Sequence, residues 1–262
     1  MTMELHSDGL RTGRSWTNDL WATCPWQGIG NDPGLGFRFF TDFVGENAGD
    51  WTVNSIGGTS TVALSSGHGG WLTYSANSTT DAQGGNLGLG AATSSFVTPS
   101  ASTVIFYEIL CKLTMNTGGT VGSSYIGLST QPTTSIPLGS TGAMATSIDR
   151  IGFNLLDSTA VRFNYLNNGA TAYAGDSLHT AVEATWMKLG FRMNGLTSVT
   201  PYVNSVRQST IVATSSASLP DGVMNVALST VNGASSAGTH TIVVDWLRIA
   251  CHDTAYAPVG ST

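Results

Sequence analysis

Few side chains in this sequence have the type and spacing that acid–base catalysis needs. A glycosidase built on a β-sandwich places two or three carboxylates at alternate positions of one strand, so that they face one cleft. The chain has only four glutamates, and none has a second carboxylate two residues away: Glu4, Glu46, Glu108 and Glu183. Glu108 comes nearest, but its alternate neighbours are the apolar Val104, Phe106 and Leu110. We therefore predict a paired or edge-exposed Glu108 and no catalytic residue.

The histidines and aspartates do not form a recognisable metal site. Neither an H-x-H nor an H-E-x-x-H pattern occurs among His6, His68, His179, His240 and His252. His68 lies in a glycine-rich turn, so we expect it to be a solvent-exposed turn residue. Asp81 is a lone candidate ligand for calcium, because no D-x-D-x-D run surrounds it. We predict that the chain binds no metal and no cofactor.

The three cysteines, Cys24, Cys111 and Cys251, are far apart and contain no C-x-x-C pair. That spacing fits neither a disulfide framework nor a zinc site. Cys111 and Cys251 end apolar runs, so both are predicted to be small buried side chains. His252 follows Cys251 directly, but no orienting carboxylate at a suitable spacing makes the pair a nucleophile.

Aromatic side chains offer one possible binding chemistry. A sugar site combines exposed aromatic rings with a few polar groups. Trp71 and Tyr74 are our candidate glycan-binding residues, and Tyr125 and Tyr173 could serve in the same way. The alternative for each of them is a place in the core or on a sheet face.

Composition excludes several classes of partner. The chain has 262 residues and a net charge of −6, and its two lysines and eight arginines are scattered. Because no basic stripe can neutralise a phosphate backbone, nucleic acid is not an expected partner. The longest apolar runs are a few residues, against roughly 20 for a membrane span, so no membrane partner is expected. The amino terminus lacks the features of a secretory signal, and export by that route is not expected.

Strand signals dominate the sequence from about Phe37 onward. Short alternating or apolar runs are separated by Gly, Ser, Thr and Asn clusters, which predicts roughly a dozen antiparallel strands. Asn167–Gly169 predicts a tight hairpin, residues 130–145 a surface loop, and residues 241–249 a central strand. We predict an all-β, two-sheet antiparallel jelly-roll sandwich over residues 37–262. A triple-stranded fibre is the structural alternative, but no fixed-period repeat supports it.

Residues 1–36 differ from the rest and are predicted to form an extended N-terminal docking arm. Trp16, Trp21 and Trp26 recur every five residues, which matches neither the helix nor the strand period. The arm either packs on its own sandwich or anchors the chain to another subunit, since Trp is enriched at interfaces. The candidate docking residues are Trp16, Trp21, Trp26 and Pro33. We expect removal of the arm to leave a folded β domain.

The order of the strand segments resembles that of concanavalin A-like and laminin-G-like jelly rolls. The resemblance spans about Phe37 to Cys251 and is carried by Phe39–Phe43, Gly49–Val53, Gly69–Leu72, Tyr125–Leu128, Arg150–Phe153, Trp186–Gly190, Tyr202–Val206 and Val244–Ile249. Among these jelly rolls, the sequence is most similar to those that occur as structural proteins of tailed bacteriophages. In those, an aromatic-rich segment ending in an Asp-Pro-x-x-Gly-Phe-like stretch, here Asp32–Phe37, precedes the sandwich.

The resemblance implies a non-enzymatic virion structural protein, a capsid decoration or head-fibre protein held by its N-terminal arm. Its expected partners are the major capsid protein or another virion protein and further copies of itself, in a particle assembled in the host cytoplasm. The first alternative is an adhesin on the phage tail or capsid that binds a host surface glycan. The second is a polysaccharide depolymerase, which the missing carboxylate pair disfavours.

Overall fold

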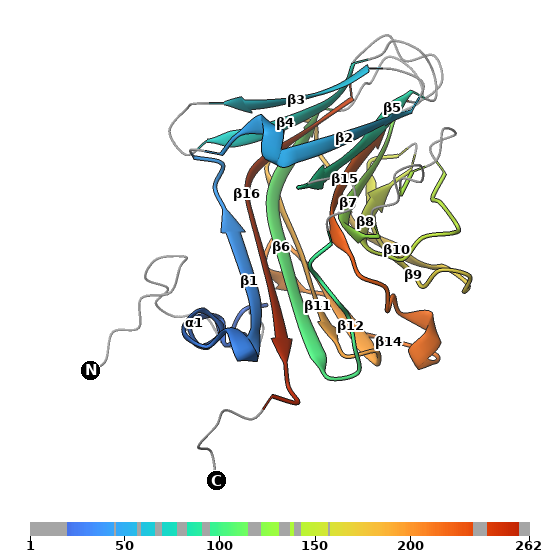
Figure 1. Cartoon of the computed structure of the whole chain (residues 1–262). Helices are drawn as coiled ribbons and strands as arrows, with labels where there is room; N and C mark the ends of the chain where they lie inside the picture. The colour runs from blue at the N-terminus through green and yellow to red at the C-terminus, as the bar shows by residue number, and fades with distance from the viewer. Residues whose placement is uncertain are drawn as a thin grey trace.

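The computed structural model describes residues 20–44, 46–56, 59–65, 70–77, 83–90, 95–114, 122–130, 137–138, 143–156, 158–232 and 240–256. In these residues the chain forms two antiparallel sheets that pack face to face (Figure 1). This confirms the predicted all-β sandwich. No helix in the described ranges is long and apolar enough to cross a membrane.

Sheet A has nine strands in the described part of the chain, and β16 lies at its centre. The order is β13-β12-β11-β6-β16-β4-β3, with β1 also paired to β16 and β14 paired to β12. Figure 1 shows the long strands β6 and β16 side by side. β16 has a paired strand on each side, which confirms the prediction that residues 241–249 form a central strand. The strands are β1 (Gly36–Thr41), β3 (Thr59–Ser65), β4 (Trp71–Asn77), β6 (Thr103–Thr114), β11 (Met187–Asn194), β12 (Ser198–Val203), β13 (Val206–Arg207), β14 (Ile211–Val212) and β16 (His240–Asp253).

Sheet B has seven strands over the same ranges, in the order β10-β9-β8-β7-β15-β5-β2. They are β2 (Trp51–Ile56), β5 (Gly84–Leu89), β7 (Ser123–Ser129), β8 (Arg150–Leu155), β9 (Ala160–Leu166), β10 (Tyr173–Thr180) and β15 (Asn225–Val231). One short α-helix, α1 (Trp26–Asn31), and three 3₁₀ turns complete the described elements: Pro33–Leu35, Ala48–Asp50 and Ser216–Ser218.

The core lies between the sheets and follows from strand alternation. On β6, Ile105, Tyr107 and Ile109 belong to the main apolar cluster, while Phe106 and Glu108 face outward. Successive side chains of a strand point to opposite faces, so each sheet also has an outer face. These two outer faces carry the candidate sites.

The turns show the expected backbone chemistry. β9 and β10 form the predicted hairpin, and Gly169 has φ 83°. The turn is not the tight one predicted, because the connection spans residues 167–172 and Asn168 does not have a positive φ. Asn204 and Ser205 have φ of 50° and 65° between β12 and β13. Two consecutive positive φ values match the right-handed twist of a two-residue hairpin.

Several predictions from the sequence are wrong in detail. A strand at Gly84–Leu89 was not predicted, because glycine weakens strand propensity. Residues 206–212, whose strand-like pattern predicts one continuous strand, form two short strands, β13 and β14, that pair with different parts of β12. The loop 130–145 does not lie wholly on the surface, because Leu138 is completely buried.

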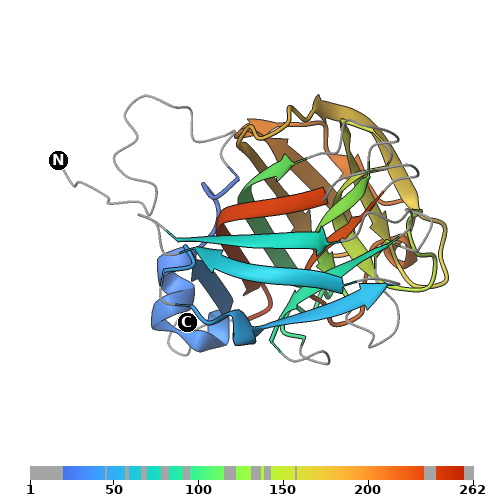
Figure 2. The same cartoon turned by 90° about the horizontal axis from the view of Figure 1, so that it is seen from above.

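The N-terminal segment packs on the outer face of sheet A. Figures 1 and 2 both place α1 next to β1, on the opposite side of the molecule from β9 and β10. Leu20 and Ile29 form a second apolar cluster with Phe106 and Ala250. The expected extended conformation is therefore wrong where α1 forms, whereas the contacts of residues 20–35 match the interpretation in which the arm packs on its own sandwich.

Candidate functional site

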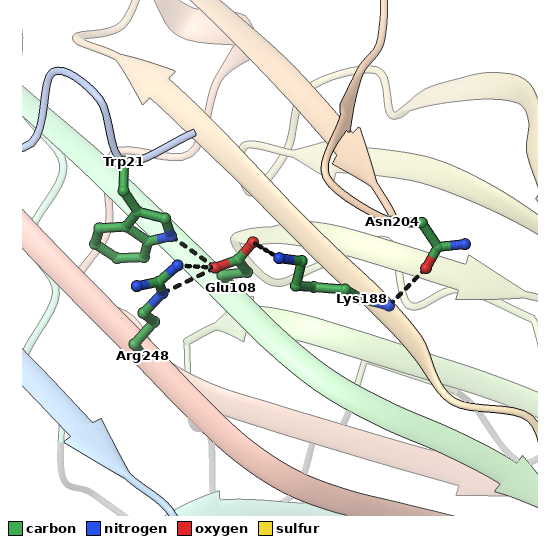
Figure 3. Close-up of polar contacts among 5 residues, drawn as sticks. All are labelled: Trp21, Glu108, Lys188, Asn204 and Arg248. Carbon is green, nitrogen blue, oxygen red and sulfur yellow. Dashed lines mark hydrogen bonds and ion pairs between the residues drawn. The ribbon is translucent and has the colours of Figure 1, made fainter. Parts of the chain in front are cut away.

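Glu108 lies on the outer face of sheet A, where three donors surround its carboxylate (Figure 3). Arg248 donates to Oε2 through Nε at 2.8 Å and Nη2 at 2.6 Å, and the Trp21 indole donates to the same oxygen at 2.7 Å. The Lys188 ammonium lies 3.6 Å from Oε1. The carboxylate is 3% exposed. The prediction that Glu108 is paired is confirmed.

Aromatic rings enclose this charged group. The Arg248 guanidinium lies 4.3 Å from the centre of the Trp21 ring and 5.4 Å from that of Trp246. Trp21 in turn stacks on Phe106, with ring centres 5.7 Å apart. Burial beside this cluster raises the pKa of the Cys24 thiol to about 12. A carboxylate with this many fixed donors fastens the N-terminal segment to the sheet.

The docking residues predicted from the sequence lie in different settings. Trp21 and Trp26 are half-buried against their own sandwich, which is the first of the two interpretations of the arm. Arg38 donates to the Trp26 carbonyl at 3.0 Å and lies over its ring. Pro33 is exposed, and Trp16 lies outside the described residues. Docking to a partner stays a prediction for these residues.

The two glycan candidates do not share a surface. Trp71 is 37% exposed, whereas Tyr74 is completely buried in the main core. The prediction of a glycan-binding ring is therefore wrong for Tyr74. Of the further candidates, Tyr125 is buried and Tyr173 stacks on Tyr165 with ring centres 4.8 Å apart.

The remaining sequence candidates that the structure describes form no catalytic or metal-binding group. Cys111 is completely buried, Cys251 is half-buried against the core, and all three cysteines are free, which confirms the absence of a disulfide framework. His68 and Asp81 lie outside the described ranges. Among the residues that are described, no three His, Cys, Asp or Glu side chains gather as metal ligands.

The outer face of sheet B carries a row of polar side chains that crosses six strands. Cross-strand neighbours in an antiparallel pair point to the same face, so the register alone places them together. The row consists of Asn54, Asn86, Ser229, Tyr125, Asn154 and Arg162, each paired in register with the next. Five strand spacings of about 4.8 Å give it a length of roughly 24 Å.

The neighbouring row on this face is almost free of side chains. Its middle positions are Gly88, Ala227, Gly127 and Gly152, again paired in register. A Cβ atom on Gly127 or Gly152 would lie 2.4 Å from a carbonyl oxygen of the adjacent strand, so glycine is required there. A third row, Asn225, Ser129 and Arg150, flanks it on the other side. We call the bare row and its two polar flanks the trench.

Hydrogen bonding along the trench is incomplete. Ser229 donates to Asn86 at 2.7 Å, and Arg150 donates to Asn164 at 2.8 Å. Three buried atoms have no hydrogen-bond partner in the structure: Asn54 Nδ2, Asn154 Oδ1 and Ser129 Oγ. Because buried polar atoms are nearly always paired, these three atoms are available to hydrogen-bond a bound molecule.

One carboxylate of unusual character lies just before β8 in the sequence. Asp149 precedes Arg150 and accepts a hydrogen bond from the Asn168 amide at 2.7 Å. Burial raises the pKa of its carboxyl above the usual value, the Asn168 amide opposes this shift, and the charge of Asp221 adds to it. A carboxyl with a raised pKa is suited to donating a proton.

Sequence reasoning missed the trench because its signal is spread over six strands. Gly88, Gly127 and Gly152 each look like an isolated strand glycine, which usually marks a bulge or a close approach of the backbone. Only the pairing register shows that they are neighbours.

Comparison with known proteins gives the fold but no family. No protein-family model matches this chain, and no curated protein matches it. A protein of unknown function from Shewanella oneidensis MR-1 has a TM-score of 0.54 at 16% identity, over 95% of this chain and 99% of its own. An endo-1,3-β-glucanase from Streptomyces sioyaensis has a TM-score of 0.54 at 13% identity, over 82% and 95%. An endo-β-1,4-glucuronan lyase from Trichoderma reesei has a TM-score of 0.52 at 11% identity, over 82% and 95%.

These structures confirm the concanavalin-like jelly-roll fold and correct one functional prediction. We predicted from the missing carboxylate pair that the chain is not an enzyme. That prediction is wrong, because the same sandwich occurs in enzymes: solved structures that share it include a glucanase and a lyase. The virion location, the capsid-protein partner and the homo-oligomer stay predictions.

Proposed function

We propose that the chain binds a carbohydrate chain along the trench on the outer face of sheet B. The observation that carries this proposal is the bare row of Gly88, Ala227, Gly127 and Gly152 between two rows of hydrogen-bonding side chains. A linear ligand that crosses the strands would lie on the backbone and meet polar groups on both sides.

The chemistry of the flanks favours a sugar over other linear ligands. Sugar hydroxyls both donate and accept hydrogen bonds, and so do the Asn amides and the Ser hydroxyl that line the trench. The chain carries a net charge of −6, which disfavours a nucleic acid. Glycines let a sugar ring approach the backbone closely, because they carry no side chain. Glucan and glucuronan are named as substrates for two proteins of the same fold, which adds support.

A binding experiment with matched variants tests this proposal. The probes are defined β-1,3-glucan, mixed-linkage β-glucan and β-1,4-glucuronan oligosaccharides long enough to cross the trench, with calorimetry as readout. Asn154→Ala removes an unpaired buried acceptor and should weaken binding about tenfold. Asn194→Ala, at an exposed site on sheet A, is the control and should bind like the wild type.

Two outcomes contradict the proposal. One is a folded wild-type chain that binds none of the probes. The other is a probe that binds with equal affinity to the wild type, Asn154→Ala and Ser129→Ala, since it would then bind elsewhere.

A second candidate function is cleavage of the bound carbohydrate, with Asp149 as the proton donor. This candidate rests on two observations: Asp149 directly precedes trench residue Arg150 in the sequence, and burial and the charge of Asp221 raise the pKa of its carboxyl. New reducing or unsaturated chain ends should appear with the wild type and should be lost in Asp149→Asn. Asp176→Asn, at an exposed position on β10, is the control. Binding without any new chain ends would reject cleavage and leave the binding proposal intact.

The predicted location in a phage particle is compatible with this function. A glycan-binding sandwich on a capsid or tail would act as an adhesin for a host surface glycan. Mass spectrometry of purified particles tests that location: copies in the hundreds would indicate the capsid, and about a dozen would indicate the tail.

A further inference from the structure

The middle of the trench is occupied by a side chain of the same protein. Leu138 is completely buried and forms a third apolar cluster with Tyr125, Ala227 and Val231, against which Met144 also packs. Ala227 belongs to the bare row of the trench, and Tyr125 belongs to one of its polar flanks. Leu138 therefore lies over β15 and β7, halfway along the trench.

Leu138 lies in the connection between β7 and β8, and contacts between two short pieces of that connection fix its position. Leu138 pairs with Met144 as an isolated antiparallel bridge, and the Ala145 amide donates to the Pro137 carbonyl at 2.9 Å. The Arg150 guanidinium, from the third row, donates to the Ala145 carbonyl. We call residues 137–138 and 143–149 the strap.

The strap accepts a hydrogen bond from Arg150 but leaves other polar groups of the trench unpaired. An apolar leucine can neither donate nor accept, and Asn154 Oδ1 and Ser129 Oγ remain buried without partners. Burying Leu138 favours the covered state, whereas the unpaired polar atoms disfavour it. The two effects oppose each other, which is the balance expected of a segment that a ligand can displace.

We propose that the strap is a self-inhibitory element, and that a carbohydrate enters the trench by displacing Leu138. This inference rests on the proposed function, because it names the step that controls access to the same site. Displacement lowers the apparent affinity by the fraction of molecules whose trench is open. Weakening the strap should therefore tighten binding.

The test uses Leu138→Ser and Met144→Ser, which remove the apolar contacts of the two legs of the strap. Either variant should bind the oligosaccharide about tenfold more tightly than the wild type. Leu156→Ser, at an exposed position after β8, is the matched control and should bind within twofold of the wild type. In the wild type, saturating oligosaccharide should also accelerate hydrogen exchange at the Ala145 amide, because its bond to Pro137 opens.

A measurement without ligand separates this inference from the proposed function. Tyr125 is completely buried beneath Leu138, so nitration by tetranitromethane, mapped by mass spectrometry, should rise several-fold in Leu138→Ser or Met144→Ser. Unchanged nitration in both folded variants overturns the strap whether or not any sugar binds. The proposal is also overturned if both variants bind the oligosaccharide no more tightly than the wild type. It is likewise overturned if the wild type binds the oligosaccharide without a change in hydrogen exchange at the Ala145 amide. If neither the wild type nor the two variants bind any oligosaccharide but nitration of Tyr125 rises in the variants, carbohydrate binding is rejected. The conclusion that the strap covers the trench then still holds.

Discussion

At Glu108, two cations and an indole share one carboxylate that is almost fully removed from water. Such a group is held by its partners, because an isolated charge at this depth would be costly. The loss of the carboxylate charge would leave Arg248 and Lys188 beside each other without a counter-charge. The cluster therefore depends on every member.

We expect Glu108→Gln to lower the free energy of unfolding by about 3 kcal/mol, because breaking a buried ion pair leaves its partner uncompensated. Urea denaturation measures the change. Glu183→Gln, at an exposed position, is the control and should alter stability by less than about 0.5 kcal/mol. A Glu108→Gln chain as stable as that control would show that the cluster is not a fastening.

His240 makes stability depend on pH. It lies buried at the start of β16, with its Nε2 atom 2.7 Å from the Ser124 hydroxyl, and burial lowers its pKa to about 4. The unfolded chain takes up this proton near pH 6.5, so the folded state loses stability as the pH falls from about 6.5 to about 4. The loss should reach about 3 kcal/mol.

Denaturation midpoints at a series of pH values across that window measure the effect. In His240→Gln the contribution of this residue to the slope should disappear, because glutamine does not titrate. An identical slope in the variant and the wild type would assign the acid sensitivity to other groups.

Residue-scale predictions from the sequence worked where they rested on local pattern. Glu108 was predicted to be paired from its apolar neighbours, but its partner Arg248 lies 140 residues away and gave no local signal. Trp71 and Tyr74 were proposed together, although residues three apart on a strand point to opposite faces. Strand alternation alone therefore excludes a binding surface that contains both Trp71 and Tyr74.

The N-terminal segment packs on its own sandwich, which is one of the two roles predicted for it. Residues 20–35 cover Phe106 and Ala250 and supply one donor to Glu108. Spacing in the sequence could not show this, because the segment has no strand or helix period and its contacts are with distant strands.

Removal of residues 1–35 should lower the urea midpoint by more than removal of residues 1–19. The longer deletion exposes the apolar cluster around Leu20 and Ile29 and leaves Glu108 without Trp21. At about 25 cal/mol per Å² of apolar surface, such an exposure costs several kcal/mol. Equal midpoints for the two truncated chains would restore the original expectation of a separable arm.

β5 shows the opposite kind of error, a strand hidden by its composition. Its sequence contains three glycines, which lower strand propensity. It is nevertheless paired on both sides, with β2 and with β15, so tertiary pairing overrides the local preference.

At the scale of the whole molecule, alternation of apolar residues was sufficient to predict the two-sheet sandwich. The strand register was not predictable, because it is decided by pairing between segments up to more than a hundred residues apart. The trench exists only through that register. This is why the fold was predicted and the candidate site was not.

The sheet order predicts a gradient of local stability. β6 is paired on both sides, with β11 and β16, whereas β13 and β14 pair with β12 alone among the described strands. Native-state hydrogen exchange should therefore be slowest for the β6 amides and fastest, among the strands described, for those of β13 and β14. Uniform protection across sheet A would mean that it opens only as a unit.

The central place of β16 also constrains how the molecule can be made. This strand comes after all the others described, yet β1, β4 and β6 all pair with it. During synthesis, those earlier strands leave the ribosome long before the segment that joins them. Sheet A can therefore close only after the last strand has emerged, which exposes unpaired edges for most of the time of translation.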